Sequence, residues 1–241
     1  MTAPKSALFS RRAGSQTERA YGLLEEMIVT GELPPASQWS EHALGAKIGL
    51  GRSPVRDALQ KLAFQRLVRI APRQGIFISE IDYQGQLQII EARREIEHLI
   101  VAQAALRATG KERQAMARLV QELKKLKRRH DMRSYLRLHF ALTSQLGTAS
   151  RNSYAAEFYA MLQTLARRFL YFHQKHHSEL ELICDLHIGQ LDAVIEGQPE
   201  AARQAAAARN DYAEKLARDT IMELIAASEV TIKPVGKAAG I

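Results

Sequence analysis

The chain has 241 residues, of which 46% are hydrophobic, so it can bury a core as one large domain or as two smaller ones. Its single cysteine, Cys184, excludes an internal disulfide network and a zinc module built on two or four cysteines. Apolar runs stay below the about 18 residues that a membrane-spanning helix needs, so we expect no membrane span. The single cysteine fits a reducing cytoplasm. Lys and Arg number 34 against 26 for Asp and Glu, and this net charge of +8 favours an anionic partner such as nucleic acid.

Glycine and proline divide the chain into two regions with different patterns. Residues 31–80 contain five Gly and four Pro, as expected of short elements joined by turns. Residues 82–228 contain few of either and are predicted to form long helices. We therefore predict a mainly α protein with two domains, over residues 15–80 and 82–228. The first 15 residues and the tail after Ser228 lack periodicity and are predicted to be flexible arms.

The first domain begins with apolar residues spaced as on one face of a helix, from Ala20 to Ile28. A short helix follows, for which Ser40 is the predicted N-cap. Ser53 is the predicted N-cap of a third helix, with Pro54 at the first position, where the missing N–H of proline costs nothing.

Two short apolar runs after the third helix, Val68–Ile70 and Ile76–Ile78, predict a β-hairpin with residues 71–75 as its loop. Three helices followed by a hairpin predict a winged helix-turn-helix, in which the third helix reads the major groove of DNA and the hairpin contacts the phosphate backbone. The candidate DNA-binding residues lie at these two places, and they are Arg52, Ser53, Arg56, Arg69, Arg73, Gln74 and Gly75. The same spacing would also fit a solvated basic helix end that binds no partner.

The segment from Tyr21 to Ile78 resembles the DNA-binding domain of GntR-family bacterial transcription regulators. Residues 51–59, GRSPVRDAL, are similar to the recognition segment of that family, and residues 31–35, GELPP, are similar to the turn after its first helix. The resemblance places the two family arginines on Arg52 and Arg56 and the wing glycine on Gly75. The chain departs from the family pattern at a few other positions, which are Trp39, Gly51, Gln65 and Arg66.

The second region resembles the all-helical ligand-sensing domain of the FadR-like branch, often called FCD. Residues 91–97, EARREIE, are similar to its opening helix, and Leu138-His139 with Asn152 is similar to its central segment. His187 and residues 191–197 are similar to the helix that follows. The resemblance implies a helical effector-binding and dimerisation domain.

Four predicted helices of the second domain each carry one basic side chain on an otherwise apolar face. These side chains are Arg93, His139, His187 and Arg209. Burial of such groups is costly without a partner, so together they indicate one shared polar cavity inside a helical bundle. The alternative is that each group is satisfied separately, as a hydrogen-bonded core histidine or as an arginine paired with an acid such as Glu97.

Many FCD domains bind a divalent metal through one Asp or Asn and three histidines. His139 and His187 match two of these histidines, whereas Tyr135 replaces the acid and Arg209 replaces the third histidine. Because a permanent cation repels a metal, we expect the metal site to be lost and no cofactor to be bound. The arginines would instead bind a carboxylate or phosphate group through paired hydrogen bonds. The candidate effector-binding residues are Arg93, Tyr135, His139, Asn152, His187 and Arg209, and a divalent metal, if bound, would be held by His139 and His187.

Two further clusters are predicted to be solvated helix ends. His173 and His177 are spaced for chelation of a metal, with His176 beside them, and residues 124–130, KKLKRRH, form a basic run. The favoured interpretation of both is an exposed helix end, at which the histidines interact with the helix dipole. The alternatives are a metal site at the histidines and a second DNA site at the basic run.

Together these patterns predict a sequence-specific transcriptional repressor that binds a palindromic DNA operator as a homodimer and responds to a small organic acid. One alternative is a metal-dependent helical enzyme that uses His139 and His187. Another is an architectural DNA-binding protein without an effector. The chain has no nucleophile motif or phosphate-binding loop that would favour the enzyme.

Overall fold

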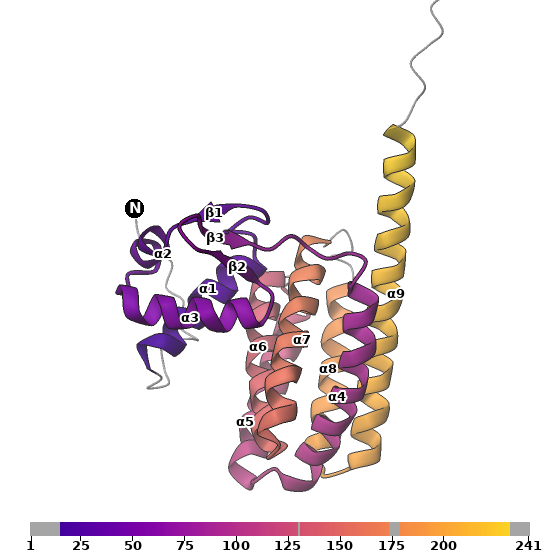
Figure 1. Cartoon of the computed structure of the whole chain (residues 1–241). Coiled ribbons are helices and arrows are strands. Elements are labelled where there is room, and N and C mark those ends of the chain that lie inside the picture. The colour runs from indigo at the N-terminus through magenta and orange to yellow at the C-terminus, as the bar shows by residue number, and fades with distance from the viewer. Residues whose placement is uncertain (1–14, 130, 174–178, 232–241) are drawn as a thin grey trace, which may run out of the picture.

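The computed structural model of the chain describes residues 15–129, 131–173 and 179–231, with side chains as far as residue 226. Within these residues a small N-terminal domain with a short sheet lies against the side of a bundle of long helices (Figure 1). The mainly α fold predicted from the sequence is confirmed. The first 14 residues of the predicted N-terminal arm and the tail beyond Thr231 lie outside the described residues.

The N-terminal domain consists of three helices and three short strands. These elements are α1 (Gln16–Val29), β1 (Gln38–Trp39), α2 (Glu41–Ile48), α3 (Arg52–Phe64), β2 (Val68–Ala71) and β3 (Gly75–Ile78). Ser15 and Glu18 cap α1 reciprocally, and the hydroxyl of Ser40 accepts a hydrogen bond from the backbone N–H of Ala43 at the start of α2. Apolar side chains of α1 and α3, among them Leu24, Ile28, Val55, Leu59 and Leu62, form one buried core.

The prediction that Ser53 caps the third helix is wrong. Helix α3 begins at Arg52, and its N-cap is Gly51, which makes no side-chain cap hydrogen bond. Pro54 therefore occupies the third helical position. The sequence left the first residue of this helix open, because the first N–H groups of a helix have no intrahelical acceptor. The first turn therefore tolerates proline at more than one position.

The sheet has one more strand than the predicted hairpin. Strands β2 and β3 pair antiparallel, and β1 pairs with the other edge of β3, with Gln38 opposite Phe77 and Trp39 opposite Ile76. A two-residue strand carries no periodicity that a sequence could reveal. Because β1 lies between α1 and α2 in the chain, its pairing with β3 attaches the wing to the rest of the domain.

The second domain is the helical bundle. Its elements are α4 (Gln86–Arg107), α5 (Gly110–Leu126), α6 (Met132–Ala149), α7 (Ser153–Phe172), α8 (Leu180–Ile195) and α9 (Pro199–Thr231). A continuous apolar core runs between these helices and includes Ile100, Leu123, Leu142 and Leu191. Figure 1 shows the last turns of α9 projecting beyond the other helices. No helix of the described ranges is long and apolar enough to cross a membrane.

Helix α7 joins the two domains. Its Leu165 packs against the apolar core of the N-terminal domain, and the ring of Phe172 lies over Gly31, 2.9 Å from the place where a Cβ would stand. The guanidinium of Arg168 donates hydrogen bonds to the backbone oxygens of Ser79 and Glu80, in the segment that leaves the sheet. These contacts hold the N-terminal domain against α7.

Candidate functional site

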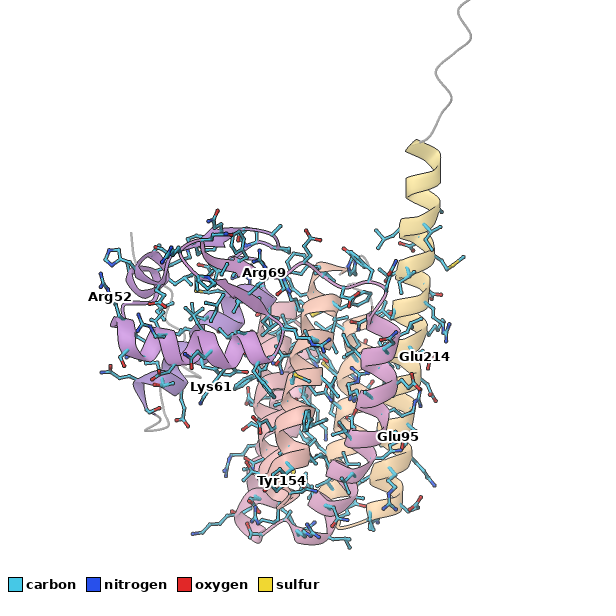
Figure 2. All side chains as sticks on the ribbon, in the orientation of Figure 1. Arg52, Lys61, Arg69, Glu95, Tyr154 and Glu214 are labelled. Carbon is cyan, nitrogen blue, oxygen red and sulfur yellow. The ribbon has the colours of Figure 1, made fainter. Side chains whose placement is uncertain are left out.

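The N-terminus of α3 presents the polar residues that the sequence assigned to DNA. Arg52, Ser53 and Arg56 are all exposed. Figure 2 shows Arg52 at the end of α3 that lies farthest from the bundle. Arg56 forms an ion pair with Glu41 of α2, with 3.1 Å between Nη2 and Oε2, and its side chain is 61% exposed. Such an exposed pair contributes only about 0–1 kcal/mol, so the guanidinium can leave Glu41 for a DNA group at small cost.

The wing presents the second group of predicted DNA-binding residues. Arg69, Arg73 and Gln74 are exposed, and the guanidinium of Arg69 lies over the ring of Phe77 at 4.3 Å. Arg73 has a φ of 62° at the tip of the turn, which directs the chain back into β3. The contact of these residues with DNA stays a prediction.

Gly75 has a structural role that the sequence did not reveal. Its φ is 104°, and a Cβ there would lie 2.7 Å from the carbonyl oxygen of Trp39. The glycine is therefore required by the close approach of β1 and by the backbone conformation, because L side chains rarely adopt this φ. A close approach to DNA is not needed to explain it.

The bundle encloses a polar cavity that brings together five of the six predicted effector-binding residues. They are Arg93 of α4, Tyr135 and His139 of α6, His187 of α8 and Arg209 of α9, and all are buried. The cavity has a volume of about 50 Å³. That is room for a few water molecules, so an organic acid requires the surrounding helices to move apart.

Asn152 does not belong to this cavity. It is the N-cap of α7, where its side chain accepts a hydrogen bond from the N–H of Ala155 at 3.0 Å. It lines a separate groove of about 610 Å³ between α1, α6 and α7. Asn152 follows a turn at the far end of α6, and its distance from His139 along that helix explains why the two do not meet.

Glu97 of α4 neutralises Arg209. Arg209 donates to both carboxylate oxygens of Glu97, which also accept hydrogen bonds from Gln190 at 2.7 Å and Asn210 at 2.9 Å. Burial alone would raise the pKa of Glu97, but the positive charges of Arg209 and Arg93 and these hydrogen bonds outweigh it and lower the pKa to about 2. The guanidinium of Arg209 is thus already paired with a carboxylate of the protein itself.

Arg93 is the cation of the cavity that lacks a carboxylate partner of its own. Its Nε donates to Oδ1 of Asn210 at 2.9 Å, but its buried Nη2 has no hydrogen-bond partner. Burial and the neighbouring charge of Arg209 lower the pKa of Arg93 to about 10. An unsatisfied buried donor of this kind is costly, and an anion would relieve that cost.

The two cavity histidines are neutral. The rings of His139 and His187 lie 4.8 Å apart, and Nε2 of His187 is hydrogen-bonded to the hydroxyl of Tyr135 at 3.0 Å. Burial, followed by the charge of Arg209, lowers the pKa of His187 to about 3. Burial also holds the pKa of His139 well below its ordinary value. Both nitrogens of His139 and Nδ1 of His187 lack hydrogen-bond partners.

These residues do not fit a divalent metal. In the described parts of the chain, no three or more His, Cys, Asp or Glu side chains are grouped so that they could hold a metal ion. The two imidazoles face Arg93 and Arg209, whose charges repel a cation as they repel a proton from His187. The same donors suit an anion that accepts hydrogen bonds.

Several polar residues of this region were missed from the sequence, among them Arg167, Gln190, Asn210 and the cavity-lining Gln86. Arg167 lies on the inner face of α7 and lines the cavity, while Gln190 and Asn210 hold Glu97. Gln190 lies one helical turn after His187, and Asn210 adjoins Arg209. Gln190 could have been found from the sequence because it shares the apolar face of His187, whereas Arg167 lies on a helix for which no such face was singled out.

The two remaining sequence clusters are only partly within the described residues. His173 ends α7, whereas His176 and His177 lie outside those residues. The basic run begins in the last turn of α5, and its Lys127 pairs with Asp185 of α8 at 2.7 Å. Lys127 therefore supports helix packing.

The winged domain with exposed arginines and the helical domain with a buried polar cavity together define a two-domain DNA-binding regulator. Residues 16–78 match the family model of bacterial regulatory proteins of the gntR family, and residues 88–211 match the FCD domain model. The chain belongs to the gntR family of bacterial regulatory proteins, and its second domain is an FCD domain. The family and the relatives below are transcriptional regulators and not enzymes.

Each curated relative matches only part of the chain. An HTH-type transcriptional regulator of Streptomyces ambofaciens is 42% identical over 62 residues, which is 26% of either chain. The repressor GlaR of Escherichia coli is 30% identical over 87 residues, 36% of this chain and 40% of GlaR. The regulator McbR of Escherichia coli is 24% identical over 116 residues, 48% of this chain and 52% of McbR. The chain spans about half or less of the length of these three relatives.

Solved structures share the fold over both domains. The structure of Escherichia coli McbR/YncC has a TM-score of 0.73 at 20% identity and covers 86% of this chain and 99% of that chain. A GntR transcriptional regulator from Rhodococcus sp. RHA1 has a TM-score of 0.63 at 22% identity, with the same coverage. At these identities the likeness establishes the fold and not the ligand.

Proposed function

We propose that this protein is a transcriptional repressor that binds a palindromic operator and is released from it by a small organic acid. The observation that carries the effector part is Arg93, whose buried Nη2 has no partner in a cavity that also contains unpartnered imidazole nitrogens. Such a donor set is complementary to a carboxylate. GlaR, a relative over part of the chain, is named as a repressor, which favours the same sign of regulation here.

Thermal unfolding of the full chain in a panel of mono- and dicarboxylates tests this function. A saturable rise in melting temperature that Arg93→Gln abolishes is the expected result, because a ligand that binds only the folded state stabilises it by mass action. The same acid should release wild-type protein from an operator selected from random DNA. If the protein converts a bound acid into a product, the chain is an enzyme. If no acid binds, the architectural alternative is favoured.

The cavity works without a metal in this proposal. His139 and His187 supply two imidazoles, and the positions of the other two family ligands hold Tyr135 and Arg209. Elemental analysis of purified protein tests this point. One equivalent of zinc or nickel that is lost in a His139→Ala variant would overturn it.

The DNA-bound form in this proposal is a cytoplasmic homodimer. One recognition helix reads too few base pairs for specificity, and two-fold symmetry matches a palindromic site. Four large apolar side chains are exposed on the packed pair α4 and α7: Leu99, Leu106, Tyr154 and Phe158. This apolar face of α4 and α7 is the surface that a second copy would cover.

A further inference from the structure

Arg167 of α7 is a buried cation that touches both domains. It is 3% exposed, as is Glu25 of α1, and its Nη2 donates to Oε1 of that carboxylate. The hydroxyl of Thr164 completes the cluster, since it donates to Glu25 at 2.9 Å and accepts from Arg167 at 2.7 Å. Glu25 is thereby the one buried acid of the N-terminal domain among the described residues, and it is bound by the helical domain.

The same side chain also lines the effector cavity, as well as the groove that contains Asn152. Arg167 lines that cavity together with Arg93 and His139, and its buried Nη1 has no hydrogen-bond partner. A guanidinium is planar and binds a carboxylate best through two parallel N–H groups. An anion in the cavity is therefore bound most tightly when Arg167 turns two parallel N–H groups toward it. That rotation removes a hydrogen-bond donor from Glu25.

Movement of Glu25 would be carried to the DNA-binding surface. The neighbouring residues of α1, Leu24 and Ile28, are fully buried against α3 in the core of the N-terminal domain. Packed cores do not deform continuously, so α1 and α3 move as one unit. A carboxylate left without its partner at a buried site is strongly destabilising, which supplies the driving force for this movement.

We propose that Arg167 is an effector-binding residue that the anion and Glu25 share, and that competition for it transmits effector binding to the DNA-binding domain. This inference rests on the proposed function, because it requires an anion in the cavity. Arg167 is the residue through which an anion in the cavity acts on the DNA-binding domain. Loss of the Glu25 contact loosens the N-terminal domain and weakens operator binding.

The test compares Glu25→Gln with Glu26→Gln in the full-length protein. Glu26 is the next residue of α1 and also pairs with the bundle, at 2.7 Å from Arg137, but Arg137 does not line the cavity. Titration calorimetry with succinate, benzoate and inorganic phosphate as probes measures anion binding. Glu25→Gln should bind a probe at least about 5-fold more tightly than wild type, the lower end of usual coupling between sites, and Arg167→Gln should lose that binding. Glu26→Gln should behave as wild type.

Operator binding without any probe is measured on the same variants. Glu25→Gln and Arg167→Gln should each weaken binding to a DNA site selected by the wild type, and the double variant should be no weaker than the singles, because both remove one contact. Equal probe affinity in wild type and Glu25→Gln would overturn the proposal, as would unchanged operator binding in both single variants. If no probe binds any variant, the organic-acid effector fails, and the operator measurement alone then decides whether Glu25 and Arg167 are coupled. A merely structural role of Glu25 would not raise the affinity for a probe.

Discussion

At the scale of single residues, the chemistry of the cavity depends on how three arginines and two glutamates are paired. Arg209 is bound by Glu97, Arg167 is bound by Glu25, and Arg93 has no carboxylate of its own. The sequence marks Arg93 and Arg209 equally, as basic residues on apolar helix faces. Only the three-dimensional pairing separates a structural arginine from one that is available to a ligand.

Loss of the Glu97 carboxylate should destabilise the fold strongly. Glu97→Gln leaves the buried Arg209 without a counter-charge, and breaking such a pair costs roughly 3–5 kcal/mol of unfolding free energy. Urea unfolding followed by circular dichroism measures this. Glu95→Gln is the control, because Glu95 is exposed on the same helix (Figure 2) and should change stability by less than about 0.5 kcal/mol. An equal effect of both variants would contradict the assignment.

Acid should remove the contribution of Glu97 over a defined pH range. The pKa of this carboxyl is about 2 in the folded protein and has an ordinary value of 4.5, so the unfolded chain takes up its proton first as pH falls. The stabilisation is complete above pH 4.5 and is lost as pH falls from there toward 2. Each pKa unit corresponds to about 1.4 kcal/mol, so the stability gap between wild type and Glu97→Gln should shrink by roughly 3 kcal/mol. A gap that stays constant with pH would refute this.

At the scale of elements, the wing and α3 are held in place by features that have little or no sequence signal. Strand β1 contributes two residues, and its pairing with β3 explains why Gly75 must lack a side chain. The end of α3 with Arg52 and Arg56 is left exposed because the buried face of this helix, which includes Val55 and Leu59, packs on α1.

Gly75→Ala should destabilise the wing. Its φ of 104° and the 2.7 Å approach to Trp39 together predict a cost of roughly 1–3 kcal/mol, measured as a lower unfolding free energy. Gly189→Ala provides a contrast of opposite sign. Gly189 lies in α8 with open space around its Cβ position, so alanine should stabilise that helix by up to about 1 kcal/mol. An unchanged unfolding free energy in Gly75→Ala would show that β1 can move away from the added methyl group without cost.

Arg52→Ala and Arg56→Ala should each weaken specific DNA binding by roughly 1–3 kcal/mol if their side chains contact bases. Fluorescence anisotropy on a selected operator measures this loss. Lys61→Ala is a matched control, because Lys61 is an exposed cation near the opposite end of the same helix (Figure 2). If Lys61→Ala weakens binding as much as the arginine variants, general charge and not the helix N-terminus determines the affinity.

At the scale of the whole molecule, the two domains form one unit because α7 lies between them. One face of α7 carries Leu165 and Phe172 into the N-terminal domain, and the same helix supplies Arg167 to the cavity. A ligand that moves α7 therefore acts on both domains at once.

Dimerisation should depend on the apolar face of α4 and α7. Leu106 and Phe158 are 62% and 48% exposed, and a charge there would be buried at the interface of a dimer. Light scattering should give twice the chain mass for the wild type and a single chain mass for Leu106→Asp with Phe158→Asp. Leu182→Asp is the control, since Leu182 is 47% exposed on α8 and lies outside this face. A dimer that survives the double change would place the interface elsewhere.

The sequence alone predicted the three N-terminal helices, the hairpin of β2 and β3, the long helices after residue 82 and the recognition segment, because these follow from local periodicity, turn residues and a contiguous motif. Five of the six residues that the sequence predicted to share a cavity do line one, since each lies on the buried face of its own helix. The tertiary structure alone decided that Arg209 is paired with Glu97, that Asn152 caps α7 in another groove, and that Arg167 connects the cavity to Glu25. Pairing between residues far apart in the chain depends on the distances between packed helices, and no local pattern encodes those distances.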